Sequence, residues 1–252
     1  LFILIPISAA FFYGESIDNF LQSFLIIFFV GLVAYFPNKK ERSQIKIREG
    51  FLIVAIFWFV LSFFGAIPFL MDESLKFSLV DAVFESASGW TTTGATVVSN
   101  IDNLNKPLLL YRQLLQWLGG IGIVVLVLAI LPILGVGGMY LYKAETSSPV
   151  KDNKLSPRIT ETAKSLWGVY IVLTIACAVL YKIAGMSYFD AIGHSFSTVS
   201  IGGFSTHDAS IGFYSSDLIK IICMVFMFLS ALNFVLHFLF YKNKSLTVYT
   251  SN

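Results

Sequence analysis

Long, nearly uninterrupted apolar runs are the feature that most constrains how this sequence folds. An α-helix needs about 20 mostly apolar residues to cross a bilayer. Runs of that length lie at 18–36, 51–71, 162–184 and 217–240, a longer one at 108–138 and a shorter one at 1–12. We expect 1–12 to be the end of a spanning helix that begins upstream, with a processed N-terminus as the alternative. The runs predict an all-α membrane protein, a polytopic helical bundle.

The composition excludes an ordinary soluble domain. Only 13% of the residues are charged and 56% are hydrophobic, whereas soluble domains contain about 25% charged residues. A chain this apolar cannot cover its surface with polar groups, so membrane lipid is the expected surrounding. The net charge of +2 gives no indication of a nucleic-acid partner. Cys177 and Cys223 lie inside apolar runs and are expected to be buried hydrophobes.

The basic residues predict the orientation of the spans. Most of the 17 Lys and Arg residues lie in three segments, 37–50, 138–165 and 241–252. These segments alternate correctly along the chain if all three are cytoplasmic, as the excess of positive charge on that side of membranes requires. The remaining connections and their helix ends are mostly acidic. By itself this charge indicates a solvated set of acidic loops, with attraction of cations to the external face as the alternative.

The two long external connections contain an internal repeat with an offset of 109 residues. Both connections carry Ser-x-x-Asp-Ala, followed by two serines and a glycine. The matched pairs are Ser78 and Ser187, Asp81 and Asp190, Ser86 and Ser195, Ser88 and Ser197, and Gly94 and Gly203, with Trp58 and Trp167 upstream. Because the register is ungapped, we infer two copies of one unit.

Each unit predicts a short helix that dips into the membrane and returns. Ser-x-x-Asp is a helix-start signal, and it predicts helices over 79–90 and 188–199. Helices of that length reach only about 18 Å. The segments after them, 91–96 and 200–205, are then non-helical backbone at membrane depth, which is tolerated only where it is covered or lines a water-filled cavity. The predicted fold is therefore two helix–pore-loop–helix repeats with re-entrant half-helices.

Such segments favour binding of a desolvated monovalent cation. Extended backbone presents a row of carbonyl oxygens that replace the hydration shell of the ion, and glycine permits the required dihedral angles. The partially negative C-terminal ends of the short helices point at the same cavity. Glu85 and Arg112 are expected to support the pore loop and to pair, because charges at membrane depth are costly. The glycines of 118–122 indicate either a hinge or close helix packing.

The expected division of the chain follows from these units. An N-terminal helix pair with a cytoplasmic loop occupies 1–50, and the first repeat 51–138. A cytoplasmic linker covers 139–161, the second repeat 162–240 and a cytoplasmic tail 241–252.

Three motifs resemble the TrkH family of bacterial potassium uptake proteins, in the Trk/Ktr/HKT superfamily. They are ESASGWTTTGAT at 85–96, RQLLQWLGGIG at 112–122 with LGVGGM at 134–139, and STVSIGGFSTH at 197–207. The resemblance implies a first filter strand at Thr92, Thr93, Gly94 and Ala95, and a second at Ile201, Gly202, Gly203 and Phe204. It implies K⁺ at the backbone oxygens of Thr92, Thr93, Gly94, Ile201, Gly202 and Gly203. It also implies that the pore helices are supported by Asp81, Glu85, Arg112 and Asp190.

The resemblance also implies a setting and partners. It predicts K⁺ uptake across the bacterial cytoplasmic membrane by a multi-pass protein that is not an enzyme and has no cofactor besides the transported ion. Family members have four repeats, so we expect a missing C-terminal half with two more; assembly of two copies into one pore is the alternative. A homodimer and a cytosolic nucleotide-binding subunit of the TrkA type are implied by resemblance only.

Other functions stay open at this point. A secondary transporter of another solute also uses broken helices, although such proteins usually pair inverted repeats and these two run in the same orientation. Na⁺/K⁺ cotransport by the same fold is a further alternative. An intramembrane enzyme would need a cluster of acid, base, nucleophile or metal ligands, and the sequence offers none; a non-transporting scaffold is the last alternative.

Overall fold

The structure, a computed structural model, describes residues 2–39, 47–130 and 159–232, together with residues 234, 236, 237 and 240. Within these residues the chain is helical or irregular and contains no β-strand. Residues 40–46 and 138–158 of the basic segments expected on the cytoplasmic side lie outside this part of the chain, as do residues 131–138 of the longest apolar run and all of the tail, 241–252.

The N-terminal quarter contains four helices, α1 (Leu4–Tyr13), α2 (Asp18–Asn38), α3 (Ile47–Gly65) and α4 (Ile67–Met71). The single helix expected over 51–71 is thus divided at Ala66. Pro68 explains the break, because it has no N–H to continue the hydrogen-bond ladder and its ring clashes with the preceding turn. The Tyr111 hydroxyl donates a 2.9 Å hydrogen bond to the Gly65 carbonyl that the break leaves available.

The rest of the chain repeats one order of elements. After α3 and α4 come the short helix α5 (Leu79–Trp90), an irregular segment with the 3-10 helix η1 (Ile101–Asn103), and the long helix α6 (Lys106–Ile130). Then come the long helix α8 (Ile159–Ile183), the short helix α9 (Tyr188–Val199), an irregular segment with η3 (Ser210–Phe213), and α10 (Asp217–Ala231). The short helices have the bounds expected from the sequence.

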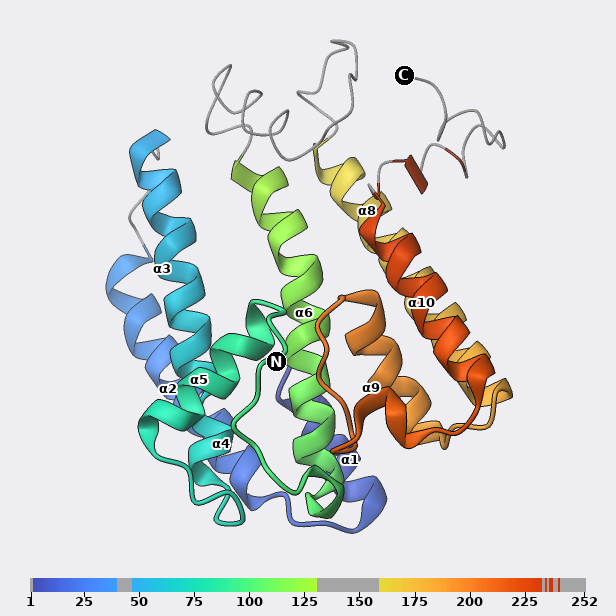
Figure 1. Ribbon diagram of the computed structural model, residues 1–252. Helices are drawn as coiled ribbons and strands as arrows, with labels where there is room; N and C mark the ends of the chain where they lie inside the picture. The colour runs from blue at the N-terminus through green and yellow to red at the C-terminus, as the bar shows by residue number, and fades with distance from the viewer. Residues whose placement is uncertain are drawn as a thin grey trace.

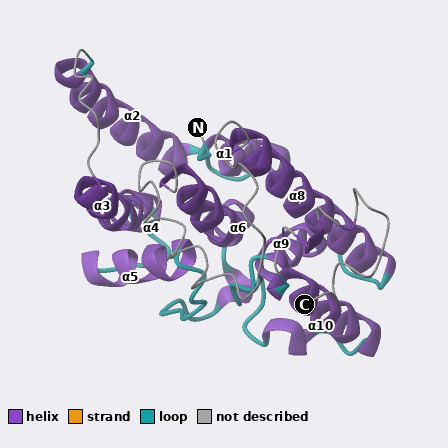
Figure 2. Ribbon diagram, turned by 90° about the horizontal axis from the view of Figure 1, so that it is seen from above, coloured by secondary structure: helices purple, strands orange, loops and turns teal. Residues whose placement is uncertain are grey.

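Helix α6 lies at the centre of this arrangement (Figure 1). The two short helices lie on either side of it, α5 beside α3 and α9 beside α8, and the view from above shows the same order (Figure 2). After each short helix the chain runs back in an extended path alongside α6 (Figure 1). These two returning segments, residues 91–100 after α5 and 200–209 after α9, therefore have the same helix as their support.

Two buried clusters flank α6. One contains residues of α4, α5 and α6, among them Phe69, Ala82 and Leu115. The other joins α6 to α8, α9 and α10, with Ile121, Tyr170 and Phe226 as members. Each short helix is thus anchored in its own apolar core, and the polar segments between the cores are positioned from both sides.

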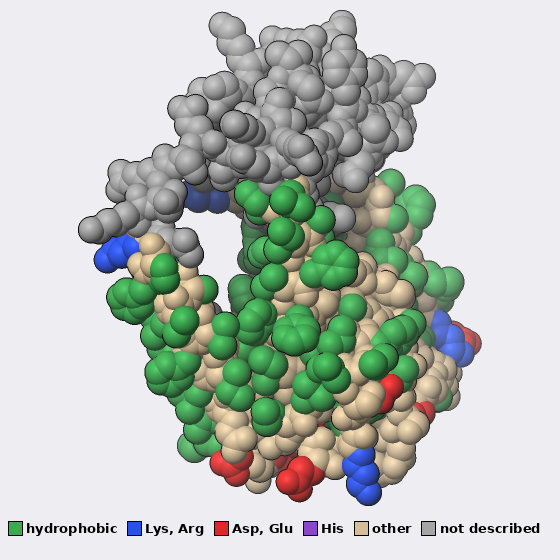
Figure 3. Space-filling view, turned by 90° about the vertical axis from the view of Figure 1, so that its left-hand side faces the viewer, with side chains coloured by type: hydrophobic (Ala, Val, Ile, Leu, Met, Phe, Trp, Pro, Cys, Tyr) green, Lys and Arg blue, Asp and Glu red, His purple; other side chains and the backbone are tan. Residues whose placement is uncertain are grey.

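The outer surface is strongly apolar. Figure 3 shows hydrophobic side chains over the middle of one face and charged side chains at its lower edge. Large side chains such as Val33, Phe59 and Phe228 are exposed. In the described part of the chain, two helices are long and apolar enough to cross a membrane, over Asp18–Pro37 and Lys164–Ile183.

Candidate functional site

The two short helices begin in the same way. In α5 the Ser78 hydroxyl accepts a hydrogen bond from the Asp81 amide at 3.2 Å, and the Ser78 amide donates to the Asp81 carboxylate at 3.0 Å. In α9 the Ser187 hydroxyl accepts from the Asp190 amide at 3.0 Å. Both acidic residues occupy the first turn, where a negative charge suits the helix dipole.

The two helices also end in the same way. The amides of Thr91, Thr92 and Thr93 donate to the carbonyls of Ala87, Gly89 and Ser88. The amides of Ser200, Ile201 and Gly202 donate to the carbonyls of Phe196, Thr198 and Ser197. Each bond of the first set has its counterpart 109 residues later, so the sequence match corresponds to matched backbone geometry at these two helix ends.

The backbone after each helix adopts left-handed conformations at matched positions. Thr92 and Ile201 have φ angles of 54° and 55°, and Gly94 and Gly203 have 75° and 90°. Thr93 and Gly202, which lie between them, do not have positive φ. A positive φ disfavours residues with a Cβ. Thr92 and Ile201 therefore bear backbone strain, and glycine avoids it at positions 94 and 203.

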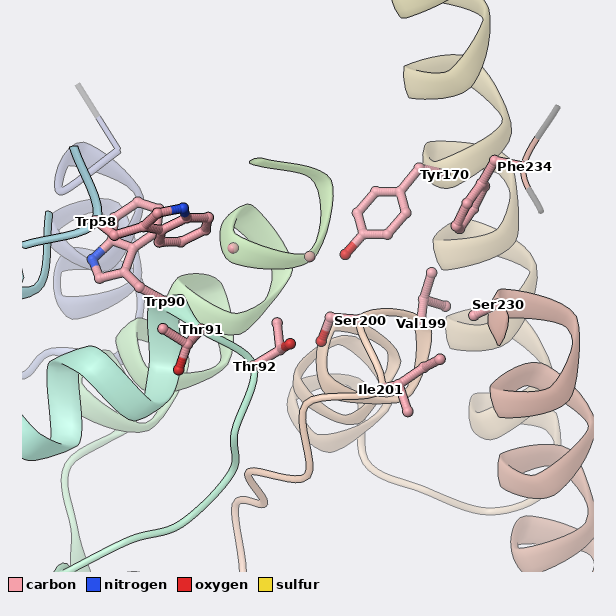
Figure 4. A pocket seen from close by; sticks show the side chains of 12 residues that line it. Trp58, Trp90, Thr91, Thr92, Tyr170, Val199, Ser200, Ile201, Ser230 and Phe234 are labelled. Atoms are coloured by element: carbon pink, nitrogen blue, oxygen red, sulfur yellow. The ribbon is translucent and has the colours of Figure 1, made fainter. Parts of the chain in front are cut away.

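The C-terminal ends of both short helices line one cavity of about 410 Å³. Thr91 and Thr92, from the end of α5, face Ser200 and Ile201, from the end of α9, across this space (Figure 4). The cavity thus receives the partially negative ends of two helices together with hydroxyl oxygens. That combination suits a cation.

Two glycines of α6 let the ends of the short helices approach closely. A Cβ on Gly119 would lie 2.0 Å from the carbonyl oxygen of Trp90, and one on Gly120 would lie 2.8 Å from the Cβ of Ser200. A Cβ on Gly122 would meet nothing nearer than 4.0 Å. Of the two roles considered for 118–122, close packing is therefore observed at Gly119 and Gly120.

The expected ion pair of Glu85 and Arg112 is present and fully buried. Arg112 Nε lies 2.9 Å from Glu85 Oε1, and both side chains are inaccessible to solvent. The carboxylate also accepts hydrogen bonds from the Thr96 hydroxyl at 2.9 Å and the Val97 amide at 3.1 Å. The carboxylate of α5 therefore ties the end of the first returning segment to its own helix.

Arg112 also reaches the second returning segment. Its Nη2 donates to the Thr96 hydroxyl at 3.0 Å, while its Nη1 donates to the Ser205 carbonyl at 3.2 Å. Its guanidinium lies over the Phe204 ring, 4.4 Å from the centroid. One side chain of α6 thus holds both segments in register.

In the second unit a histidine takes the place of the Glu85 carboxylate. His194 occupies the position 109 residues after Glu85, and Ser205 the position 109 after Thr96. His194 Nε2 is hydrogen-bonded to the Ser205 hydroxyl at 3.0 Å, and the His207 amide donates to that hydroxyl at 3.0 Å. The Val98 amide makes the matching bond to Thr96 at 3.1 Å. The 109-residue register aligns these positions, but the change of residue type from glutamate to histidine conceals their shared role.

Gln116, one turn after Arg112, is a site residue that the sequence analysis did not single out. Its Nε2 donates to the Gly202 carbonyl at 2.7 Å, and its Oε1 accepts from the Phe204 amide at 3.0 Å. Gln116 is fully buried. A polar side chain within an apolar spanning helix is the signal that could have identified it.

The predicted filter carbonyls are not equally available. Within the described part of the chain, no hydrogen bond reaches the carbonyls of Thr92, Thr93, Gly94, Ile201 and Gly203. The Ala95 carbonyl accepts from the Ser88 hydroxyl at 2.6 Å, and the Gly202 carbonyl is held by Gln116. Of the six oxygens expected to contact K⁺, that of Gly202 is thus the one that accepts a hydrogen bond within the described part of the chain.

The connections that follow α5 and α9 meet at a latch formed by Asp102, His207 and Asp208. His207 Nδ1 lies 2.5 Å from Asp102 Oδ1. The Ile101 amide donates to the Asp208 carboxylate at 3.0 Å, and the Asp208 amide donates to that of Asp102 at 3.3 Å. The hydrogen bond from His207 lowers the pKa of the Asp102 carboxyl below its usual value. The latch joins the first connection to the second outside the apolar core.

Comparisons of the sequence and the structure with known proteins all indicate the same family. The sequence profile of the TrkH cation transport proteins matches residues 16–251. The Trk system potassium uptake protein TrkH of Escherichia coli (strain K12) is 53% identical over 247 residues, which cover 98% of this chain and 51% of that protein. TrkG of the same strain is 44% identical over 242 residues, covering 96% of this chain and 50% of TrkG.

A solved structure is similar as well. The crystal structure of the potassium transporter TrkH from Vibrio parahaemolyticus matches with a TM-score of 0.82 and 48% sequence identity, over 96% of this chain and 48% of that one. The chain therefore spans about half the length of the relatives that it matches.

Proposed function

The chain belongs to the TrkH family of cation transport proteins, and from that premise we propose that it conducts K⁺ into the cell past the two left-handed segments that follow α5 and α9. The observation that carries this proposal is the matched pair of backbones, Thr92–Gly94 and Ile201–Gly203, at the ends of two helices that line one cavity. The relatives TrkH and TrkG of Escherichia coli are potassium uptake proteins.

The proposed ligands are backbone oxygens. Five of the six carbonyls expected to bind K⁺ accept no hydrogen bond among the described residues, those of Thr92, Thr93, Gly94, Ile201 and Gly203, so they are free to replace the hydration shell of the ion. The helix ends beside them add a partial negative charge. The Thr92 and Ser200 hydroxyls, at the cavity, extend the polar path away from the filter.

The proposed architecture is two helix–pore-loop–helix repeats in a membrane. The matched hydrogen bonds at both ends of α5 and α9 support a repeat. The exposed apolar side chains of the long helices support a lipid-facing surface. The extended segments after the short helices lie beside α6 and between two buried clusters, which is the protection that non-helical backbone needs at membrane depth.

Two units enclose only part of a pathway. We therefore place this chain beside two further repeats in the complete protein, in a dimer, in the bacterial cytoplasmic membrane. A cytosolic nucleotide-binding subunit of the TrkA type is the proposed regulator. The half-length match to the relatives supports the further repeats, and the regulator rests on the family alone.

Growth on limiting potassium tests the proposal. The complete gene is expressed in a bacterial strain that lacks its own potassium uptake systems, with empty vector as the control. Restored growth at low K⁺, with uptake of K⁺ exceeding uptake of Na⁺, is the expected result. Growth no better than the control, in cells that contain the protein in their membranes, would contradict the proposed function; equal uptake of both ions would favour Na⁺/K⁺ cotransport.

A further inference from the structure

Gln116 spans two peptide groups of the second returning segment. Its amide N–H bonds the Gly202 carbonyl and its amide oxygen bonds the Phe204 N–H, at 2.7 and 3.0 Å. These two groups lie on either side of Gly203, whose φ is 90°. Because both bonds come from one planar amide on α6, the side chain fixes the orientation of both peptides together.

The first returning segment has no equivalent of this pair of side-chain hydrogen bonds among the described residues. Thr93 lies 109 residues before Gly202, and in the described chain its carbonyl accepts no hydrogen bond. The two segments share their φ pattern but differ in which oxygens are engaged. The difference is therefore produced by the support from α6 rather than by the local backbone conformation.

The Gly202 oxygen is enclosed on a second side. A Cβ on Gly94 would lie 2.0 Å from it, so the oxygen lies directly against the backbone of the first segment. Gln116 occupies one direction around this oxygen and Gly94 another. One of the two lone pairs of this oxygen is bonded to Gln116 and the Gly94 backbone packs against it, so we expect a cation to bind the neighbouring carbonyls in preference to this one.

We propose that Gln116 is a specificity-determining positioning residue, which keeps the Gly202 carbonyl out of the set of oxygens that bind the ion. This inference rests on the proposed function. Gln116 itself contacts no ion. It determines whether the second segment supplies a backbone oxygen at Gly202, the position that matches Thr93 in the first segment. The number of coordinating dipoles is one of the terms that separates K⁺ from Na⁺, so the predicted effect of Gln116 is on ion preference.

Gln113 provides a matched control on the same helix. It is also fully buried, but neither polar atom of its amide has a hydrogen-bond partner among the residues that the structure describes. Replacing either glutamine by Met retains much of the side-chain volume and removes the amide. Only the change at 116 removes hydrogen bonds to the second segment.

The test compares Gln116→Met and Gln113→Met in the complete protein, reconstituted in liposomes, by the ratio of K⁺ to Na⁺ flux. We expect Gln116→Met to lower that ratio roughly tenfold, the scale set by loss of a buried hydrogen bond, and Gln113→Met to leave it unchanged. An unchanged ratio in Gln116→Met, or an equal fall in both variants, would overturn the inference. A merely structural role would lower the amount of folded protein without changing the ratio.

Gly202→Ala gives an independent test that leaves Gln116 in the sequence. Its Cβ would lie 2.4 Å from the side-chain Cδ of Gln116, so the alanine displaces the Gln116 side chain. Because φ at 202 is not positive, alanine adds no left-handed backbone strain there. We expect the same fall in the flux ratio, with no further fall in the double variant Gln116→Met/Gly202→Ala. A ratio like that of the parent in Gly202→Ala would overturn the inference even if Gln116→Met does not fold. Absence of K⁺ preference in the parent protein would instead contradict the proposed function.

Discussion

The carbonyl oxygen of Gly202 lies against the Cα of Gly94, where a Cβ on Gly94 would be only 2.0 Å away. The two returning segments therefore touch through backbone atoms at a point where one of them must be glycine. Gly203, the repeat-related partner of Gly94, is less confined, since its Cβ would meet nothing nearer than the Gly94 Cα at 3.8 Å.

This difference predicts unequal effects of alanine at the two glycines. Both substitutions place a Cβ at positive φ, which costs about 1–2 kcal/mol. Gly94→Ala adds a backbone clash, so its thermal midpoint should fall well below that of Gly203→Ala. Thermal unfolding of the purified proteins in detergent measures both. Equal midpoints for the two variants would mean that the segments are not in contact at Gly94.

The buried ion pair predicts that removing one partner is worse than removing both. Arg112→Met leaves the Glu85 carboxylate, which is inaccessible to solvent, without its countercharge, at a cost of roughly 3–5 kcal/mol. Adding Glu85→Gln removes the unpaired charge and should recover part of the loss. The measurement is again the thermal midpoint of single and double variants. A double variant less stable than Arg112→Met would contradict the pairing.

The glycines of α6 predict which added methyl group is tolerated. Gly119→Ala meets the Trp90 carbonyl at 2.0 Å, whereas Gly122→Ala meets nothing nearer than 4.0 Å. Overpacking typically costs about 1–3 kcal/mol, so Gly119→Ala should be destabilised by that amount. Gly122→Ala is the matched control and should behave like the parent. Similar loss in both would show that the close approach of α5 to α6 is unimportant.

The external latch predicts a pH dependence in acid. The pKa of Asp102 is lowered in the folded protein by its hydrogen bond with His207. A carboxyl with a lowered folded-state pKa contributes stability above its unfolded pKa of about 3.9, and this contribution is lost as the pH falls through the folded value. The stability difference between the parent and Asp102→Asn should thus be present at neutral pH and shrink below about pH 4. A difference that does not change with pH would contradict this role of the latch.

The sequence predicted the parts of the fold that depend on local signals. Ser78 and Ser187, each followed by an aspartate three residues later, correctly predicted the starts of α5 and α9, because helix capping is decided within one turn. The pairing of Glu85 with Arg112 was also expected, since buried charges need partners. The filter itself stays a prediction that only ion measurements test.

Tertiary contacts account for what the sequence did not reveal. Gln116 has the same residue type as Gln113, three positions away, and only the packing of α6 against the second segment distinguishes them. The 109-residue register aligns His194 with Glu85, but only the hydrogen bonds to Ser205 and Thr96 show that the two side chains have the same role. The break at Ala66, by contrast, had a local signal in Pro68, which the apolar character of 51–71 outweighed.

The ratio of K⁺ to Na⁺ flux in Gly203→Ala tests the central claim most directly, with Gly212→Ala as its control. A Cβ on Gly212 would meet no atom within 4 Å, and Gly212 has no positive φ. If the segments after α5 and α9 form the ion filter, Gly203→Ala lowers the flux ratio and Gly212→Ala does not. Parent-like ratios in both variants, in folded and reconstituted protein, would contradict the assignment of the filter.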